Sequence, residues 1–168
     1  ETWGILRYAA AQAFSAALYD KLTGSSTVNS FIYSNIDYIM GSNSAGQSFI
    51  VGFGDKSPKH PHHRNVFLND DNVNNEEKNQ LPIPEHNQQH GYMVGGMAVP
   101  GEFQDNINDY AINEGGIDYN AGLVAALEYI MSKLAPVDTS KFTGNSSAIR
   151  FTEKKDLVKR KFYSPHTI

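Results

Sequence analysis

Four acidic residues lie close together between Phe103 and Ala121, and one of them, Glu114, could donate a proton in catalysis. A carboxylic acid can do this near neutral pH only if burial or nearby negative charge keeps it protonated. Asp118 follows Glu114 by one helical turn, and Asp105 and Asp109 precede it. Two other readings remain open: the four acids are solvated, or Glu114 only caps a helix N-terminus.

A second segment with chemical potential runs from Ser48 to Arg64 and combines glycines, prolines, histidines and arginine. Glycine lets the backbone approach a ligand closely, and proline stiffens a loop. The imidazole of His62 and the guanidinium of Arg64 supply directional hydrogen-bond donors. This composition suits a polar ligand, although an ordinary surface loop is an equal alternative.

The histidines also raise the possibility of a zinc site, because imidazole is a common metal ligand. His60, His62 and His63 lie within four residues, with His86 and His90 further along. Adjacent histidines rarely point the same way, and the chain has no cysteine to complete a ligand set. We therefore expect no metal site and no cofactor in this chain.

Hydrophobic spacing predicts three helices that must position these segments. The first spans residues 3–22 and stops before Gly24, and the second spans residues 28–40 and ends at Gly41. The third is expected from Asn113 to Leu134, with Pro136 beyond its end. The predicted fold class is therefore all-α, with Glu114 in the first turn of the third helix.

The connection between the second and third predicted helices is unusually long. It covers about 70 residues with little helical periodicity, which compact domains seldom carry without a function. The polar run from Asn69 to Gln80 reads as an excursion from the body of the domain. The only candidate strand is Ser48 to Val51. We expect this connection both to hold a functional surface and to be disordered in part.

Charge and hydropathy exclude two classes of partner. Residues 1–135 carry 7 Lys/Arg against 15 Asp/Glu, whereas residues 136–168 carry 7 against 3. An acidic body disfavours binding to nucleic acid, which requires a basic face. No apolar run approaches the ~18 residues of a membrane span. The first residues also lack the pattern of a secretory leader.

Taken together, the two segments resemble glycoside hydrolase family 9, which comprises cellulases and related β-glucanases. The family motif S-F-x-V-G-F-G-x-x-x-P-x-x-P-H-H-R is matched from Ser48 through His62 to Arg64. The second motif, an aromatic-x-D-x4-aromatic-x3-E followed by Y-N-A, is matched by Phe103, Asp105, Tyr110, Glu114, Tyr119, Asn120 and Ala121. Further matches, in the same order as in the family, are Trp3 to Phe14, Asp37 to Asn43 and Met93 to Gly96.

This resemblance implies the C-terminal portion of an (α/α)6 barrel with long active-site loops. It also implies inverting hydrolysis of β-1,4-glucosidic bonds in cellulose or related β-glucans, by a secreted enzyme. Glu114 would be the general acid, with Asp105 orienting or tuning its surroundings. His62 and Arg64 would bind sugar hydroxyls. Tyr110 and Tyr119 are candidates for lining the sugar site, and packing within the fold is an equal alternative for each.

The chain departs from the family in two respects. Gly115 and Gly116 replace the Val-Ala pair that usually follows the family's glutamate, which loosens the first turn of the expected helix. The family's catalytic base is an aspartate in a D-A-G-D type motif, which this chain lacks.

The absence of that base predicts a fragment. Residues 1–135 would be the C-terminal part of the catalytic domain, and residues 136–168 a basic tail of unknown role. The partners of the chain would be a β-glucan and the missing N-terminal segment of the same catalytic domain. Two rivals remain: a catalytically idle carbohydrate-binding module and a histidine-rich metal-binding protein.

Overall fold

The computed structural model describes residues 3–63, 66, 78, 87–97 and 103–134 of the 168-residue chain. Three features predicted from the sequence lie outside the described residues. They are Arg64, the polar run 69–80 except for Lys78, and the basic tail.

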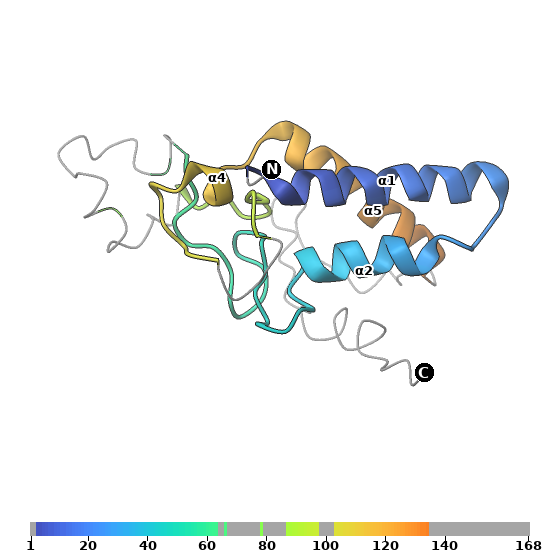
Figure 1. Ribbon diagram of the computed structural model, residues 1–168, viewed down its shortest axis with the longest axis horizontal. Helices are drawn as coiled ribbons and strands as arrows, with labels where there is room; N and C mark the ends of the chain where they lie inside the picture. Colours follow the sequence, from blue (N-terminus) through green and yellow to red (C-terminus); the bar gives the residue numbers. More distant parts are fainter. Residues whose placement is uncertain (1–2, 64–65, 67–77, 79–86, 98–102, 135–168) are drawn as a thin grey trace, which may run out of the picture.

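Helix α1 (Ile5–Thr23) and helix α2 (Asn29–Ile39) form the predicted helical hairpin (Figure 1). Helix α1 ends at Gly24, whose φ of 67° is a left-handed conformation that glycine adopts readily. Helix α2 buries Ile32, Ile36 and Ile39, whose spacing of four and three residues places them on one face. The first two predicted helices are therefore confirmed to within two residues.

The prediction of one continuous third helix from residue 113 was wrong at its start. A short helix α4 (Tyr110–Asn113) is followed by an interruption, and helix α5 (Ile117–Lys133) begins only after it. Gly116 precedes α5 in an extended conformation, with φ −158° and ψ 168°. Glycine has a low helix propensity, so a Gly-Gly pair favours such a break.

Small residues let α1 and α5 pack closely. Gly122 of α5 lies so near α1 that an added Cβ atom would stand 2.8–3.0 Å from backbone atoms of Ala10 and Ala11. Ala10, Ala13 and Ala17 form most of the buried face of α1. The alanine-rich pattern that predicted α1 thus also determines how closely it approaches α5.

The two helices run in parallel. Gly4 lies against the hydroxyl of Tyr119 at the start of both helices. Near their other ends, the hydroxyl of Tyr129 in α5 hydrogen-bonds to the carboxylate of Asp20 in α1. Asn29, at the beginning of α2, lies 3.0 Å from the same hydroxyl, so α2 runs opposite to both. Both α1 and α5 therefore begin at the end of the molecule where α4 and the loops gather (Figure 1).

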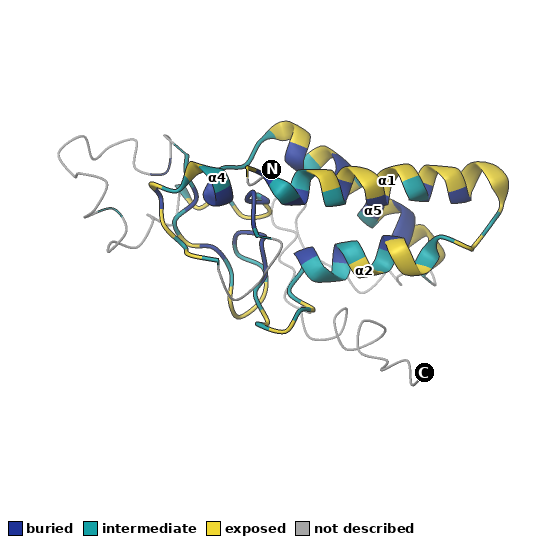
Figure 2. Cartoon of the chain, viewed as in Figure 1, coloured by how far each residue is buried: buried dark blue, intermediate teal, exposed yellow. Residues whose placement is uncertain are grey.

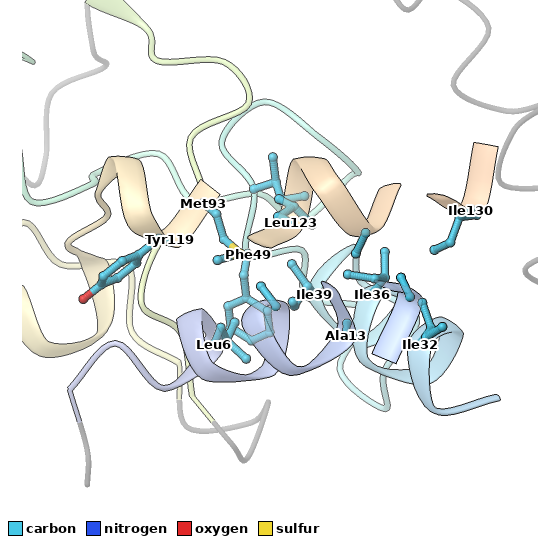
Figure 3. Close-up of a cluster of buried hydrophobic side chains, with 14 of the residues drawn as sticks. Leu6, Ala13, Ile32, Ile36, Ile39, Phe49, Met93, Tyr119, Leu123 and Ile130 are labelled. Atoms are coloured by element: carbon cyan, nitrogen blue, oxygen red, sulfur yellow. The ribbon is translucent and has the colours of Figure 1, made fainter. Parts of the chain in front are cut away.

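One hydrophobic core joins the helices to the loops (Figure 3). Phe49, from the long connection, is fully buried, stacks on Tyr38 and meets the edge of Phe103. Its amide donates to the carbonyl of Ile39, and its carbonyl accepts from the amide of Val94. The loops are thus fixed to the helices through a buried aromatic side chain.

The described residues form helices and loops without any β-strand. The expected strand at Ser48–Val51 is limited to one isolated bridge, between Ile50 and Met93, and a second bridge pairs Gln47, just before it, with Lys56. Within the described part of the chain, no helix is long and apolar enough to cross a membrane.

Candidate functional site

Glu114 lies in the short non-helical link between α4 and α5, not in the first turn of a helix. Its backbone is extended, with ψ 147°, and its amide donates to the carbonyl of Tyr110 at 3.2 Å. Its carbonyl accepts from the amide of Gly95 at 2.7 Å. Because α5 starts at Ile117, the expected one-turn relation between Glu114 and Asp118 is lost. The carboxylate is therefore oriented by its neighbours in space and not by a helix.

The side chain of Glu114 belongs to a group that we call the Trp3 cluster, which consists of Trp3, His62, Tyr110 and Glu114. The indole nitrogen of Trp3 donates to Oε2 of Glu114 at 3.0 Å. Trp3 meets Tyr110 edge to face, with ring centroids 4.9 Å apart, and Tyr110 meets His62 at 6.1 Å. Trp3 and Tyr110 are 47% and 51% exposed. Exposed aromatic surface beside a carboxylate suits a ligand that has both apolar faces and hydroxyl groups.

Asp105 is bound to the backbone of the histidine segment. Its carboxylate accepts from the amides of Lys59 at 2.7 Å and His60 at 3.0 Å, and it lies 3.2 Å from Nδ1 of His60. Burial alone would raise the pKa of Asp105, but these hydrogen bonds more than offset it and lower the pKa below its ordinary value. Asp105 therefore holds the histidine segment in place in its ionised form.

His62 links the same two motifs a second time. Its amide donates to the carbonyl of Asn113 at 2.9 Å, and its Nδ1 is hydrogen-bonded to the carbonyl of Ile107. A carbonyl can only accept, so Nδ1 carries the proton and Nε2 is the remaining nitrogen for a ligand. The structure thus brings together the two motifs that the sequence places some 45 residues apart.

Tyr119, expected to line the sugar site, is only 3% exposed. Its hydroxyl lies under Gly4, and the guanidinium of Arg7 stands 5.3 Å from its ring centroid. Burial raises the pKa of its hydroxyl. Tyr119 therefore packs inside the fold, whereas Tyr110 is exposed within the Trp3 cluster, and its lining of a sugar site stays a prediction.

Two residues in contact with the Glu114 region were not singled out from the sequence. Trp3 is the chain's only tryptophan and begins a matched motif, which was a usable signal. Tyr92, whose hydroxyl lies against Gly115, carried no such signal because its contact depends on the folded path of the chain.

An open depression of about 770 Å³ lies beside the start of α5. Its lining includes His63, Gln89, Tyr92, Gly115, Ile117 and Val124. The ring of His63 is fixed there by Gln89, whose Nε2 lies 2.8 Å from Nδ1 of the histidine. The depression therefore reaches the peptide that follows Glu114.

The histidines do not converge with acidic side chains on a common point. Among the residues that the structure describes, no three His, Cys, Asp or Glu side chains form a group able to hold a metal ion. His60 faces Asp105, His62 faces Ile107 and His63 faces Gln89. His86 lies outside the described residues.

Comparison with known proteins identifies the family. The sequence model of "Glycosyl hydrolase family 9" matches residues 1–127. The chain belongs to this family. Among relatives, it is 39% identical over 127 residues to endoglucanase A of Bacillus pumilus, covering 72% of this chain and 18% of that protein. It is 36% identical to a xyloglucan-specific endo-β-1,4-glucanase of Bacteroides ovatus, covering 73% of this chain and 21% of the relative.

Solved structures of family members give the same result. The cellulase Cel9M of C. cellulolyticum, in complex with cellobiose, is 34% identical, with a TM-score of 0.65 over 79% of this chain and 30% of that chain. Endoglucanase CelQ of Clostridium thermocellum, with cellobiose and cellotriose, is also 34% identical, with a TM-score of 0.65 over 86% of this chain and 24% of that one. The chain therefore matches part of a family 9 fold and spans less than a third of these proteins.

Proposed function

We propose that this chain supplies the general acid of an inverting β-1,4-glucanase, with Glu114 as the proton donor. Glu114 would protonate the glycosidic oxygen of the leaving sugar. An aspartate from a segment outside this chain would activate water on the opposite face of the sugar ring. Inversion requires the two carboxyl groups to stand about 6.5–9.5 Å apart, so that a water molecule fits between them.

The observation that carries this proposal is the position of the Glu114 carboxylate within the Trp3 cluster. One carboxylate oxygen accepts the indole N–H of Trp3 at 3.0 Å, which leaves Oε1 as the oxygen to face a substrate. Trp3 in turn meets exposed Tyr110, and Tyr110 meets His62, so the same cluster supplies an aromatic surface and a ring nitrogen. Further support comes from the relatives, which are named endoglucanases, and from the solved relatives in complex with cellobiose and cellotriose.

The remaining parts of the proposal concern partners and location. The chain would act after assembly with the rest of its catalytic domain, on cellulose or a related β-glucan. Arg64 would assist His62 in binding sugar hydroxyls, and Asp105 would keep the histidine segment against α4. A substrate of this size is met outside the cell, so we propose a secreted protein without a cofactor.

The test is Glu114→Gln in the chain assembled with the remainder of its catalytic domain. General acid catalysis contributes about 10²–10⁴-fold, so turnover of a soluble cellulose derivative should fall by that amount while glucan binding persists. An aryl cellobioside with a good leaving group should lose much less, because it needs little protonation. Glu128→Gln, at an exposed carboxylate near the far end of α5, is the matched control.

Two outcomes would contradict the assignment. Near-normal turnover by the Glu114→Gln protein on unactivated glucan would exclude Glu114 as the acid. If wild type binds glucan but hydrolyses neither substrate, the alternative of an idle carbohydrate-binding module is correct.

A further inference from the structure

Gly115, directly after Glu114, occupies a position with no room for a side chain. A Cβ atom there would lie 2.3 Å from the carbonyl oxygen of Met93 and 2.6–2.7 Å from ring atoms of Tyr92. Met93 is fully buried, and its amide donates to the side-chain oxygen of Asn120, so its backbone is fixed. The space that a side chain at position 115 would fill is therefore taken by the Tyr92 ring and the Met93 backbone.

The hydroxyl of Tyr92 binds both polar groups of Gly115. It accepts from the amide of Gly115 at 2.8 Å and donates to the carbonyl of the same residue at 3.0 Å. A hydroxyl has one donor hydrogen and two acceptor lone pairs, so both bonds form together. Burial raises the pKa of Tyr92, so the hydroxyl keeps the proton that the second bond requires.

Tyr92 is itself held both through its backbone and through its ring. Its amide donates to the carbonyl of Gln89 at 3.0 Å, and its carbonyl accepts from the amide of Val51 at 2.9 Å. The ring meets His63 edge to face, with centroids 5.8 Å apart. Tyr92 can therefore act as a rigid support for the peptide that it binds.

Tyr92 restrains the backbone at Gly115 and Gly116, where the chain is intrinsically flexible. Two consecutive glycines follow Glu114, and glycine restricts the backbone less than any other residue. A second contact from the same segment, the amide of Gly95 donating to the Glu114 carbonyl at 2.7 Å, binds the other polar group of the peptide whose amide Tyr92 accepts. The segment 92–95 thus holds both polar groups of the Glu114–Gly115 peptide and the carbonyl of the peptide that follows it.

We propose that Tyr92 is a positioning residue for the general acid, and that it forms a matched pair with Gly115. The ring fills the volume that a side chain at position 115 would occupy, and the two hydrogen bonds of the hydroxyl restrain a backbone that the Gly-Gly pair leaves flexible. This inference depends on the proposed role of Glu114. Tyr92 does not touch the reacting atoms; it acts through the backbone of the acid.

The test is Tyr92→Phe in the assembled catalytic domain, which keeps the ring and removes both hydrogen bonds. Small misplacement of a catalytic group is costly, so kcat on unactivated glucan should fall roughly tenfold, with KM within about twofold. On an aryl cellobioside with a good leaving group, the loss should be under about threefold. Tyr38→Phe is the matched control, because its hydroxyl donates to the carbonyl of Met97 at 2.8 Å, away from the Glu114 link.

Each result separates the positioning role from other causes. If Glu114→Gln abolishes turnover but Tyr92→Phe works at the wild-type rate, the positioning role is excluded and the proposed function stands. If the kcat of Tyr92→Phe falls equally on both substrates and the protein melts at a lower temperature, Tyr92 is only structural. If Glu114→Gln retains activity, the proposed function itself fails. A loss confined to the unactivated substrate, absent in Tyr38→Phe, supports the proposal.

Discussion

The indole nitrogen of Trp3 lies 3.0 Å from Oε2 of Glu114, so the residues just before α1 and the link before α5 meet at one carboxylate. An indole N–H can only donate, and therefore Oε2 must accept. We propose that the catalytic proton is carried by Oε1, since Oε2 is engaged by Trp3. In the proposed mechanism, this hydrogen bond selects the oxygen that protonates the leaving group.

Trp3→Phe should weaken catalysis without removing the aromatic contact with Tyr110. A hydrogen bond to a charged group contributes about 1.5 kcal/mol or more, so kcat on unactivated glucan should fall roughly tenfold. Steady-state kinetics of the assembled domain on activated and unactivated substrates provide the measurement. Equal rates in Trp3→Phe and wild type would show that the Trp3–Glu114 contact plays no part in turnover.

His62→Ala should impair substrate use more than folding. The variant loses one hydrogen bond to the Ile107 carbonyl, which contributes about 1 kcal/mol to stability. It also loses Nε2, the nitrogen proposed to bind a sugar hydroxyl. KM for cello-oligosaccharides should rise up to about tenfold, and Arg64→Ala should act in the same direction. A large drop in melting temperature with unchanged kinetics would show instead that His62 is structural.

Asp105→Ala should destabilise the fold and loosen the histidine segment. It leaves the amides of Lys59 and His60 without their acceptor, at a cost of about 1–3 kcal/mol. Because the folded-state pKa of Asp105 is lowered, its stabilising contribution is complete above the ordinary value of 3.8 and is lost as pH falls through the folded pKa. Melting temperatures of the assembled domain with wild-type or variant chain should therefore differ at pH 7 and converge in strong acid. A constant difference across this range would contradict the assigned contacts.

Asp37→Asn should have the opposite effect on stability. Burial raises the pKa of Asp37 to about 6, and its Oδ1 is buried without a hydrogen-bond partner. The folded state favours the protonated acid, so its stability contribution is present below pH 3.8 and is lost as pH rises through about 6. Above that pH, the asparagine variant should be more stable by up to about 1–2 kcal/mol, after discounting for partial exposure. Thermal melts of the assembled domain at pH 4.5 and pH 7.5 test this, since the advantage should appear mainly at the higher pH.

Local patterns in the sequence predicted the helices well, because alanine and isoleucine spacing determines which face of each helix is buried. The break before α5 could have been predicted from Gly115 and Gly116, since their low helix propensity outweighs the apolar spacing that follows. The burial of Tyr119 could not have been predicted in this way. Its hydroxyl packs against Gly4, which has a left-handed conformation and lies far away in the sequence. The hydrogen bonds between Asp105 and the histidine segment could not have been predicted either, because a sequence motif does not specify the distances between its residues in the folded chain.

The described helices also carry many exposed residues (Figure 2), and several of these have large apolar side chains. On α1, Tyr19 and Leu22 are 52% and 77% exposed, and on α5 Ile117, Val124 and Met131 are 92%, 60% and 60% exposed. Extended apolar surface of this kind drives association in water. We therefore expect residues 1–168, expressed alone, to aggregate or to lack a cooperative melt and to hydrolyse nothing.

Addition of the segment that completes the catalytic domain should restore both solubility and turnover, because its helices would cover these faces and its aspartate would supply the base. Light scattering and calorimetry of the chain alone and of the assembled domain provide the comparison. The serine variants of Leu22 and Val124 should make the isolated chain more soluble and should impair assembly. A soluble monomer that melts cooperatively without any partner would contradict the fragment hypothesis and favour a self-contained binding module.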